Sequence, residues 1–110
     1  MKIEFKDKTI ISTDFSEFET AWKIEDAALL LEYFRSKDEI VLGGDILTEK
    51  LKHNYDSWYY NTKPLYSLQY NVKQSFKVAF EYISKYIETN GDKFYVIFVL
   101  KEMPLKPSQR

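Results

Sequence analysis

Residues 39–47, with the sequence EIVLGGDIL, constrain the fold of this chain more than any other stretch. The apolar run at residues 40–42 suits a buried strand. Gly43 and Gly44 then remove two side chains, which permits a bulge or a close approach of the backbone to a neighbour. Asp45 follows at the predicted kink, where its carboxylate can accept hydrogen bonds from nearby backbone N–H groups. The stretch therefore predicts a buried strand that is interrupted at the paired glycines.

Two segments have the periodicity of amphipathic helices. In residues 24–36 the apolar side chains recur at helical spacing, and Glu25 and Asp26 lie in the first turn, where the helix dipole favours negative charge. In residues 71–89 the same spacing continues until Asn90 and Gly91, a pair typical of a helix C-terminus. We therefore predict helices over residues 24–36 and 71–89.

Three further segments are predicted to form strands. Residues 1–12 alternate between apolar and polar, which indicates a strand or a loose hairpin turning at Asp7 and Lys8. Residues 55–60, YDSWYY, are aromatic enough to pair antiparallel with the glycine-containing strand. Residues 94–100, FYVIFVL, are apolar on both faces, so this strand should be covered on both sides or lie in mid-sheet. Residues 14–20 are predicted to be a connection laid over the core.

These elements predict a small α+β domain. Their order is β–α–β–β–α–β, so we expect a mainly antiparallel sheet of about four strands with two helices packed on one face, in a ferredoxin-like arrangement. Residues 1–101 should form this single domain. Residues 102–110 contain two prolines and are predicted to be a flexible C-terminal tail.

The composition offers few residues for catalysis or metal binding. The chain has no Cys and one His, which excludes disulfides and thiolate zinc sites. His53 lies in a polar turn, where we expect it to be solvated rather than a catalytic base. Asp45 and Asp56 are the nearest approach to a carboxylate pair, but two carboxylates without a third ligand make a weak calcium or magnesium site. We therefore predict no catalytic residues, no metal site and no cofactor.

The N-terminal sequence MKIEFKDK lacks the apolar core of a signal peptide, and no run approaches the ~18 apolar residues that a membrane span needs. The absence of cysteine fits a reducing compartment. We therefore expect a cytoplasmic protein without a membrane partner. The sequence leaves the oligomeric state open.

Acidic residues gather in the first half of the chain. Residues 1–50 carry seven Lys/Arg and 12 Asp/Glu, whereas residues 51–110 carry nine and five. Between residues 14 and 39, eight acidic residues stand against three basic ones. This excess is typical of a solvated helix face, and it is also typical of a patch that attracts a basic partner. Both interpretations stay open.

The aromatic residues Tyr55, Trp58, Tyr59 and Tyr60 suit two kinds of surface. Aromatic side chains on a strand can stack on nucleic-acid bases, and Trp and Tyr also dominate the hot spots of protein interfaces. The glycine and aromatic signature of an RNA-recognition fold is absent, and the surrounding sequence is not basic. We therefore favour a protein-binding surface and keep a small RNA-binding module as the alternative.

The sequence from about residue 21 to residue 100 resembles the immunity protein 40 family of bacterial polymorphic toxin systems. The resemblance is carried by a Trp just before a helix, VLGGDIL at residues 41–47 and YDSWYY at residues 55–60, followed by a long helix and an apolar terminal strand. The residues that match the family's motifs are Trp22, Gly43, Gly44, Asp45, Asp56, Trp58 and Tyr59. Membership implies a non-enzymatic, cytoplasmic antidote that binds and neutralises a cognate toxin.

The candidate contacts with that toxin fall into two groups. The first is acidic and would suit a basic toxin such as a nuclease; it comprises Glu25, Asp26, Glu32 and Asp38. The second belongs to the motifs and comprises Asp45, Asp56, Trp58 and Tyr59. Trp22, Gly43 and Gly44 are expected to support the fold.

Overall fold

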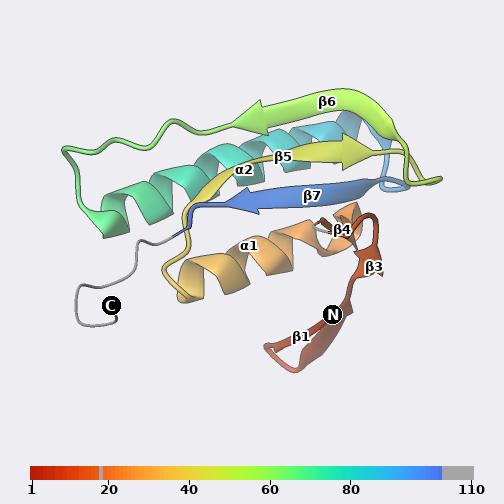
Figure 1. Cartoon of the computed structure of the whole chain (residues 1–110), viewed down its shortest axis with the longest axis horizontal. Helices are drawn as coiled ribbons and strands as arrows, with labels where there is room; N and C mark the ends of the chain where they lie inside the picture. The colour runs from red at the N-terminus through yellow and green to blue at the C-terminus, as the bar shows by residue number, and fades with distance from the viewer. Residues whose placement is uncertain (18, 103–110) are drawn as a thin grey trace.

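The computed structural model describes residues 1–17 and 19–102 (Figure 1). Of the predicted tail, residues 103–110 lie outside the described residues. The elements in chain order are the strands β1 (Lys2–Phe5), β2 (Lys8–Ile11), β3 (Thr13–Asp14) and β4 (Thr20–Lys23), the short 3-10 helix η1 (Ile24–Asp26), helix α1 (Ala27–Ser36), strands β5 (Val41–Leu47) and β6 (His53–Tyr59), helix α2 (Leu68–Asn90) and strand β7 (Tyr95–Leu100).

The fold is α+β, as predicted, with two α-helices and antiparallel sheets. Five strands form one sheet in the order β3-β4-β7-β5-β6, and β1 pairs with β2 in a separate hairpin. Both helices lie on one side of the five-stranded sheet (Figure 1). Of the described residues, no helix combines the length and apolar character that crossing a bilayer requires.

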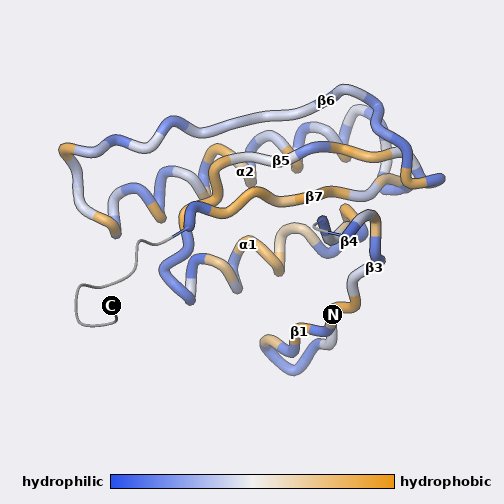
Figure 2. Tube along the Cα trace, viewed as in Figure 1, coloured by the Kyte–Doolittle hydropathy of each residue, from blue (hydrophilic) through white to orange (hydrophobic). Residues whose placement is uncertain are grey.

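The predicted ferredoxin-like arrangement is wrong. The strand expected at residues 1–12 as the first of this order lies outside the five-stranded sheet, and β4 takes its place before α1, which gives β4–α1–β5–β6–α2–β7. In space the last of these strands, β7, lies between β4 and β5. In a ferredoxin-like sheet the first and third of these strands would be central instead. Because β7 is apolar along almost its whole length whereas β6 is mostly hydrophilic, the central position goes to β7 and the edge position to β6 (Figure 2). The mid-sheet position predicted for residues 94–100 is thereby confirmed.

The N-terminal region differs from the prediction in the position of its turn, which lies at Lys6 and Asp7 rather than at Asp7 and Lys8, and in an additional strand. Residues 1–12 form the hairpin that was one of the two expected forms, with Lys6 and Asp7 at positive φ in the turn. The predicted connection over residues 14–20 instead leads into a strand, because Thr20–Lys23 pairs with the start of β7. This strand has four residues and directly precedes η1, so its sequence is too short to show the period of a strand beside the helical pattern.

The two helices are close to their predicted positions. The segment 24–36 is helical throughout, although its first turn is the 3-10 helix η1. Helix α2 begins earlier than predicted, after the N-cap Ser67, whose Oγ accepts a hydrogen bond from the Tyr70 N–H. It ends at Asn90, and Gly91 follows with a φ of 90°, as the Asn-Gly pair predicted.

The main core lies between the helices and the sheet. Helix α1 buries Ala27, Leu30, Leu31 and Phe34 there, and Trp22 on β4 and Trp58 on β6 join the same cluster. A smaller cluster lies on the other face of the sheet, where Ala21, Leu47 and Ile97 pack together at one end. The remainder of that face has no helix over it among the described residues.

Strand β5 runs through the paired glycines without a break, contrary to the predicted interruption. Gly43, Gly44 and Asp45 all pair with β7 and β6 on their two sides. A register shift against β7 does occur, but it lies just before the glycines, between Val41 and Gly43. The bulge predicted for this stretch is therefore present one step earlier in the chain.

Candidate partner-binding surface

The register of the strands shows which residues lie on the face of the sheet that carries no helix within the described part of the chain. Gly43 pairs with Tyr59 and with Val99, and Asp45 pairs with Ser57. Trp58 and Phe98, which alternate with these residues, pack on the helix side. Because side chains alternate along a strand, the five residues lie together on the opposite side. We call the surface formed by Gly43, Asp45, Ser57, Tyr59 and Val99 the open face.

The open face is a shallow hollow with an aromatic side chain at its border. These five residues line a cavity of about 360 Å³. The side chain of Tyr59 is 75% exposed and that of Val99 is 46% exposed, whereas Asp45 is half-buried. Tyrosine is enriched at the centre of protein interfaces, whereas Asp is depleted there, so Tyr59 and Val99 are the part of the open face that best suits contact with a protein.

Gly43 and Gly44 are required by the close approach of neighbouring strands. A Cβ on Gly43 would lie 2.3 Å from the backbone oxygen of Trp58 on β6. A Cβ on Gly44 would lie 2.5 Å from the backbone oxygen of Ile97 on β7 and 2.5 Å from Cη2 of the Trp58 ring. The absence of a Cβ at both positions therefore permits the close approach of the three strands and leaves room for the Trp58 ring.

Trp58 lies in the core, although it was one of the candidate contact residues. Its side chain is only 7% exposed. The ring stacks on Tyr82 of α2 at 5.1 Å between centroids and meets Phe98 edge-on at 6.0 Å. Trp22, which was expected to support the fold, is also buried.

Asp56 is exposed, but its carboxylate takes part in a network that ties β6 to α2. Tyr86 Oη donates to Asp56 Oδ2 at 2.8 Å and accepts from Asn54 Nδ2 at 2.9 Å. Burial raises the pKa of the Tyr86 phenol; the hydrogen bond from Asn54 opposes this shift, and Asp56 adds to it. The phenol therefore stays protonated at neutral pH and keeps donating to Asp56.

Between Asn54 and Asp56, Tyr55 projects from a bulge in β6. One β5 residue, Ile46, lies opposite residues 54–56, because the register pairs on either side are Asp45 with Ser57 and Leu47 with His53. Tyr55 has a φ of 63°, which is uncommon for a residue with a Cβ, and its side chain is 94% exposed. In the sequence, Tyr55 stands out only as part of the aromatic run, since no local pattern there is typical of a bulge.

The acidic candidates do not form one cluster. Glu25 and Asp26 lie in η1, before the N-terminus of α1, and Asp38 lies beyond its C-terminus, so the helix separates them by about 15 Å. Glu32 lies between these ends, and its Oε1 is 3.3 Å from Nζ of Lys6 on the N-terminal hairpin. The acidic charge is thus spread along α1 and is neutralised in part at Glu32.

The structure also separates the residues considered for metal binding and catalysis. Asp45 pairs with Ser57, so Asp45 and the adjacent Asp56 point to opposite faces of the sheet and cannot share a cation. Over residues 1–17 and 19–102 there is no group of three or more His, Asp or Glu side chains that could hold a metal ion. The His53 ring packs edge-on against Phe15, at 5.3 Å between centroids.

The aromatic run offers no continuous platform for stacked bases. Trp58 is inside the core, and Tyr60 Oη donates to Asn71 Oδ1 at 2.7 Å, so this ring is also held inward. Only Tyr55 and Tyr59 of the four are exposed. The arrangement favours contact with a protein over stacking along a single strand of nucleic acid.

Comparison with known proteins gives one match. A protein-family model described as Immunity protein 40 matches residues 11–100. No curated protein and no solved structure matches the chain. The matched range contains the whole five-stranded sheet, both helices and the open face.

Proposed function

Because the chain belongs to the immunity protein 40 family of polymorphic toxin systems, whose members are non-enzymatic inhibitors, we propose that it neutralises its cognate toxin by binding it with the open face. The toxin's C-terminal domain is the partner. Inhibition then results from covering the toxin's functional surface, and no group of this chain reacts.

The observation that carries this proposal is the exposure of Tyr59 above a rigid, glycine-supported strand pair. Tyr59 pairs with Gly43, which has no side chain to cover the ring. Tyr and Trp side chains bring a large contact area at a low entropic cost, so they often anchor interfaces. Asp45, half-buried at the base of the same hollow, would add a directed hydrogen bond or a charge contact.

The acidic residues along α1 would contribute long-range attraction rather than a single contact. Glu25, Asp26, Glu32 and Asp38 belong to the acidic half of the chain, and spread charge of one sign accelerates the encounter with a partner of opposite sign. The proposed partner is therefore a basic toxin domain, such as a nuclease, which this protein meets in the cytoplasm of the producing cell.

The test uses the C-terminal domain of the polymorphic toxin encoded next to this gene. It measures the affinity of this protein for that domain and the growth of cells that produce both. Tyr59→Ala should weaken binding at least about tenfold and reduce the growth protection that co-production gives. Tyr66→Ala is the matched control, because Tyr66 is also exposed, at 59%, but lies just before α2 and stacks on Tyr70. Equal effects of the two substitutions, or none, would exclude the open face as the binding surface.

A further inference from the structure

One edge of β7 is left without a neighbouring strand. Strand β7 pairs with β5 over its whole length, from Tyr95 to Leu100. On its other side, β4 accompanies it only as far as the pair Trp22 and Val96. No strand of the described residues continues beside Phe98, Val99 and Leu100 on that side. We call this stretch of backbone the β7 edge.

The hydrogen-bonding groups of the β7 edge point outward. The Lys101 N–H donates to the Ile40 carbonyl on the β5 side at 2.9 Å, and the Phe94 carbonyl accepts from the Ile24 N–H on the β4 side at 3.0 Å. Because these directions alternate along a strand, the N–H and C=O groups of Phe98 and Leu100 point away from β5. They are therefore available to another strand.

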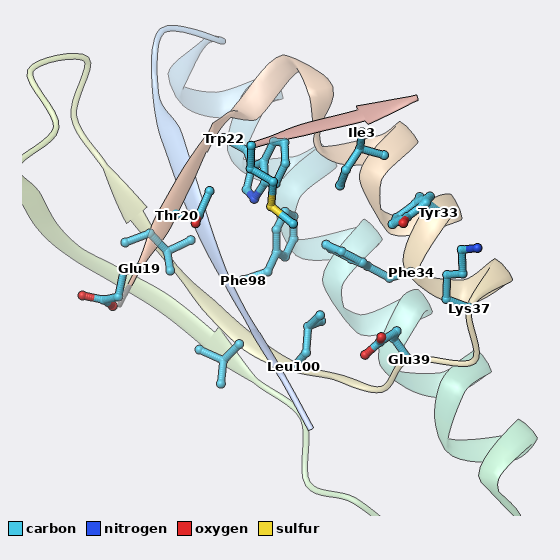
Figure 3. A pocket seen from close by; sticks show the side chains of 13 residues that line it. Ile3, Glu19, Thr20, Trp22, Tyr33, Phe34, Lys37, Glu39, Phe98 and Leu100 are labelled. Carbon is cyan, nitrogen blue, oxygen red and sulfur yellow. The ribbon is translucent and has the colours of Figure 1, made fainter. Parts of the chain in front are cut away.

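A large apolar groove lies along this edge. It has a volume of about 720 Å³. Phe98 of β7 packs edge-on against Phe34 of α1, at 5.3 Å between ring centroids, and both rings line the groove. Leu100 also lines it, and Trp22 and Ile3 lie at its upper end (Figure 3). An extended segment of four residues, about 13 Å long, can pair with the edge while its alternate side chains enter the groove.

The free edge of β6 and the β7 edge are protected differently. Strand β6 has a bulge at residues 54–56 and polar side chains. Both features are common means of preventing a strand edge from pairing with a strand of another molecule. The β7 edge has neither feature, since Phe98, Val99 and Leu100 are all apolar. An unprotected apolar edge next to an apolar groove is the arrangement that accepts an added strand.

We propose that the β7 edge binds an extended segment of the toxin, which adds to the sheet as a further strand. Among the side chains that line the groove, Glu19 and Glu39 are acidic and Lys37 is basic, so the segment should carry basic residues beside apolar ones. Val99 belongs both to the groove lining and to the open face, so one partner can cover both surfaces. This inference rests on the proposed function, because the segment belongs to the same toxin.

Amide hydrogen exchange, followed by NMR with and without the neighbouring gene's toxin domain, tests the added strand directly. The Phe98 and Leu100 amides should exchange fast in the chain alone and at least about tenfold more slowly in the complex. The Lys101 amide is the internal control, since it already donates to Ile40 in the chain alone.

A pair of substitutions at Leu100 tests the same point by affinity. Leu100→Pro removes an outward N–H without removing a bond to β5, and proline is tolerated at strand edges. Leu100→Ala removes the same apolar side chain but keeps the N–H. The proline variant should bind the toxin domain about tenfold more weakly than the alanine variant. Thermal melting of both variants checks that each one is folded.

The possible outcomes separate the two proposals. If the complex forms and depends on Tyr59 while the Phe98 and Leu100 amides exchange unchanged, strand addition is wrong and the open-face proposal stands. If the amides become protected in the chain alone as its concentration rises, the edge pairs with a second copy and the inference is overturned. If the toxin domain does not bind at all, both proposals fail.

Discussion

Replacing Gly44 with alanine tests how closely β5 must approach its neighbours β6 and β7 in the middle of the sheet. The new Cβ would lie 2.5 Å from the Ile97 backbone oxygen and 2.5 Å from Cη2 of Trp58, closer than real Cβ atoms come to such neighbours. Overpacking of this kind costs about 1–3 kcal/mol. We expect a value near the upper end, because the Ile97 oxygen belongs to the β5–β7 ladder and cannot move without disturbing it.

A smaller effect opposes this loss. Alanine restricts the unfolded chain more than glycine does, which stabilises the folded state by about 0.5–1 kcal/mol. The expected net destabilisation is therefore about 2 kcal/mol. For a chain of 110 residues this lowers the melting temperature by roughly 9 °C. The variant should still fold, since domains of this size are stable by about 5–15 kcal/mol.

Urea denaturation of a double-mutant cycle measures the packing component. In the Trp58→Phe background the indole atoms nearest Gly44 are absent, so Gly44→Ala should cost about 1 kcal/mol less than in the parent. Ser84→Ala, at an exposed position of α2, is the control and should change stability by less than about 0.5 kcal/mol. A Gly44→Ala variant as stable as this control, or strictly additive effects in the cycle, would refute the reasoning.

Three further predictions concern the buried polar network, alkaline pH and charge. Asn71→Ala should cost about 3 kcal/mol in urea denaturation, because the buried amide exchanges hydrogen bonds with Lys63, Ser67 and Tyr60; a loss below about 1 kcal/mol would contradict this. The raised pKa of Tyr86 contributes stability that is fully present below about pH 10 and is lost as the pH rises through the raised pKa. In thermal melts between about pH 9 and about pH 11, the Tyr86→Phe variant should therefore lose less stability than the parent protein. The triple change Glu25→Lys, Asp26→Lys and Glu32→Lys should slow association with the toxin domain about tenfold and flatten its salt dependence; unchanged kinetics would remove the proposed attraction.

The motif residues divide into support and surface. Gly43, Gly44 and Trp58 bring β5, β6 and α2 together, and Asp56 joins Tyr86 in holding β6 to the helix. This packing holds β6 in place, and Tyr59 of β6 projects outward on the open face. We therefore expect substitutions in the first group to lower stability and those at Tyr59 to lower affinity alone.

The sequence by itself determined the local elements and the family. Helical periodicity located both helices to within a few residues, and the apolar run at residues 94–100 predicted a central strand, because these patterns depend only on which side chains must leave water. The combination of VLGGDIL and YDSWYY was sufficient for the family resemblance, which the match over residues 11–100 confirmed.

Only the tertiary structure decided how the strands are arranged and which residues share a surface. The position of β7 between β4 and β5, and the opposite orientations of Asp45 and Asp56, depend on pairing between distant segments, which local periodicity does not encode. The β7 edge also depends on distant segments: it exists because the pairing of β4 with β7 ends at Trp22 and Val96, while β7 continues to Leu100. A free strand edge is the absence of a neighbour, and a neighbour is defined only once the whole chain has folded.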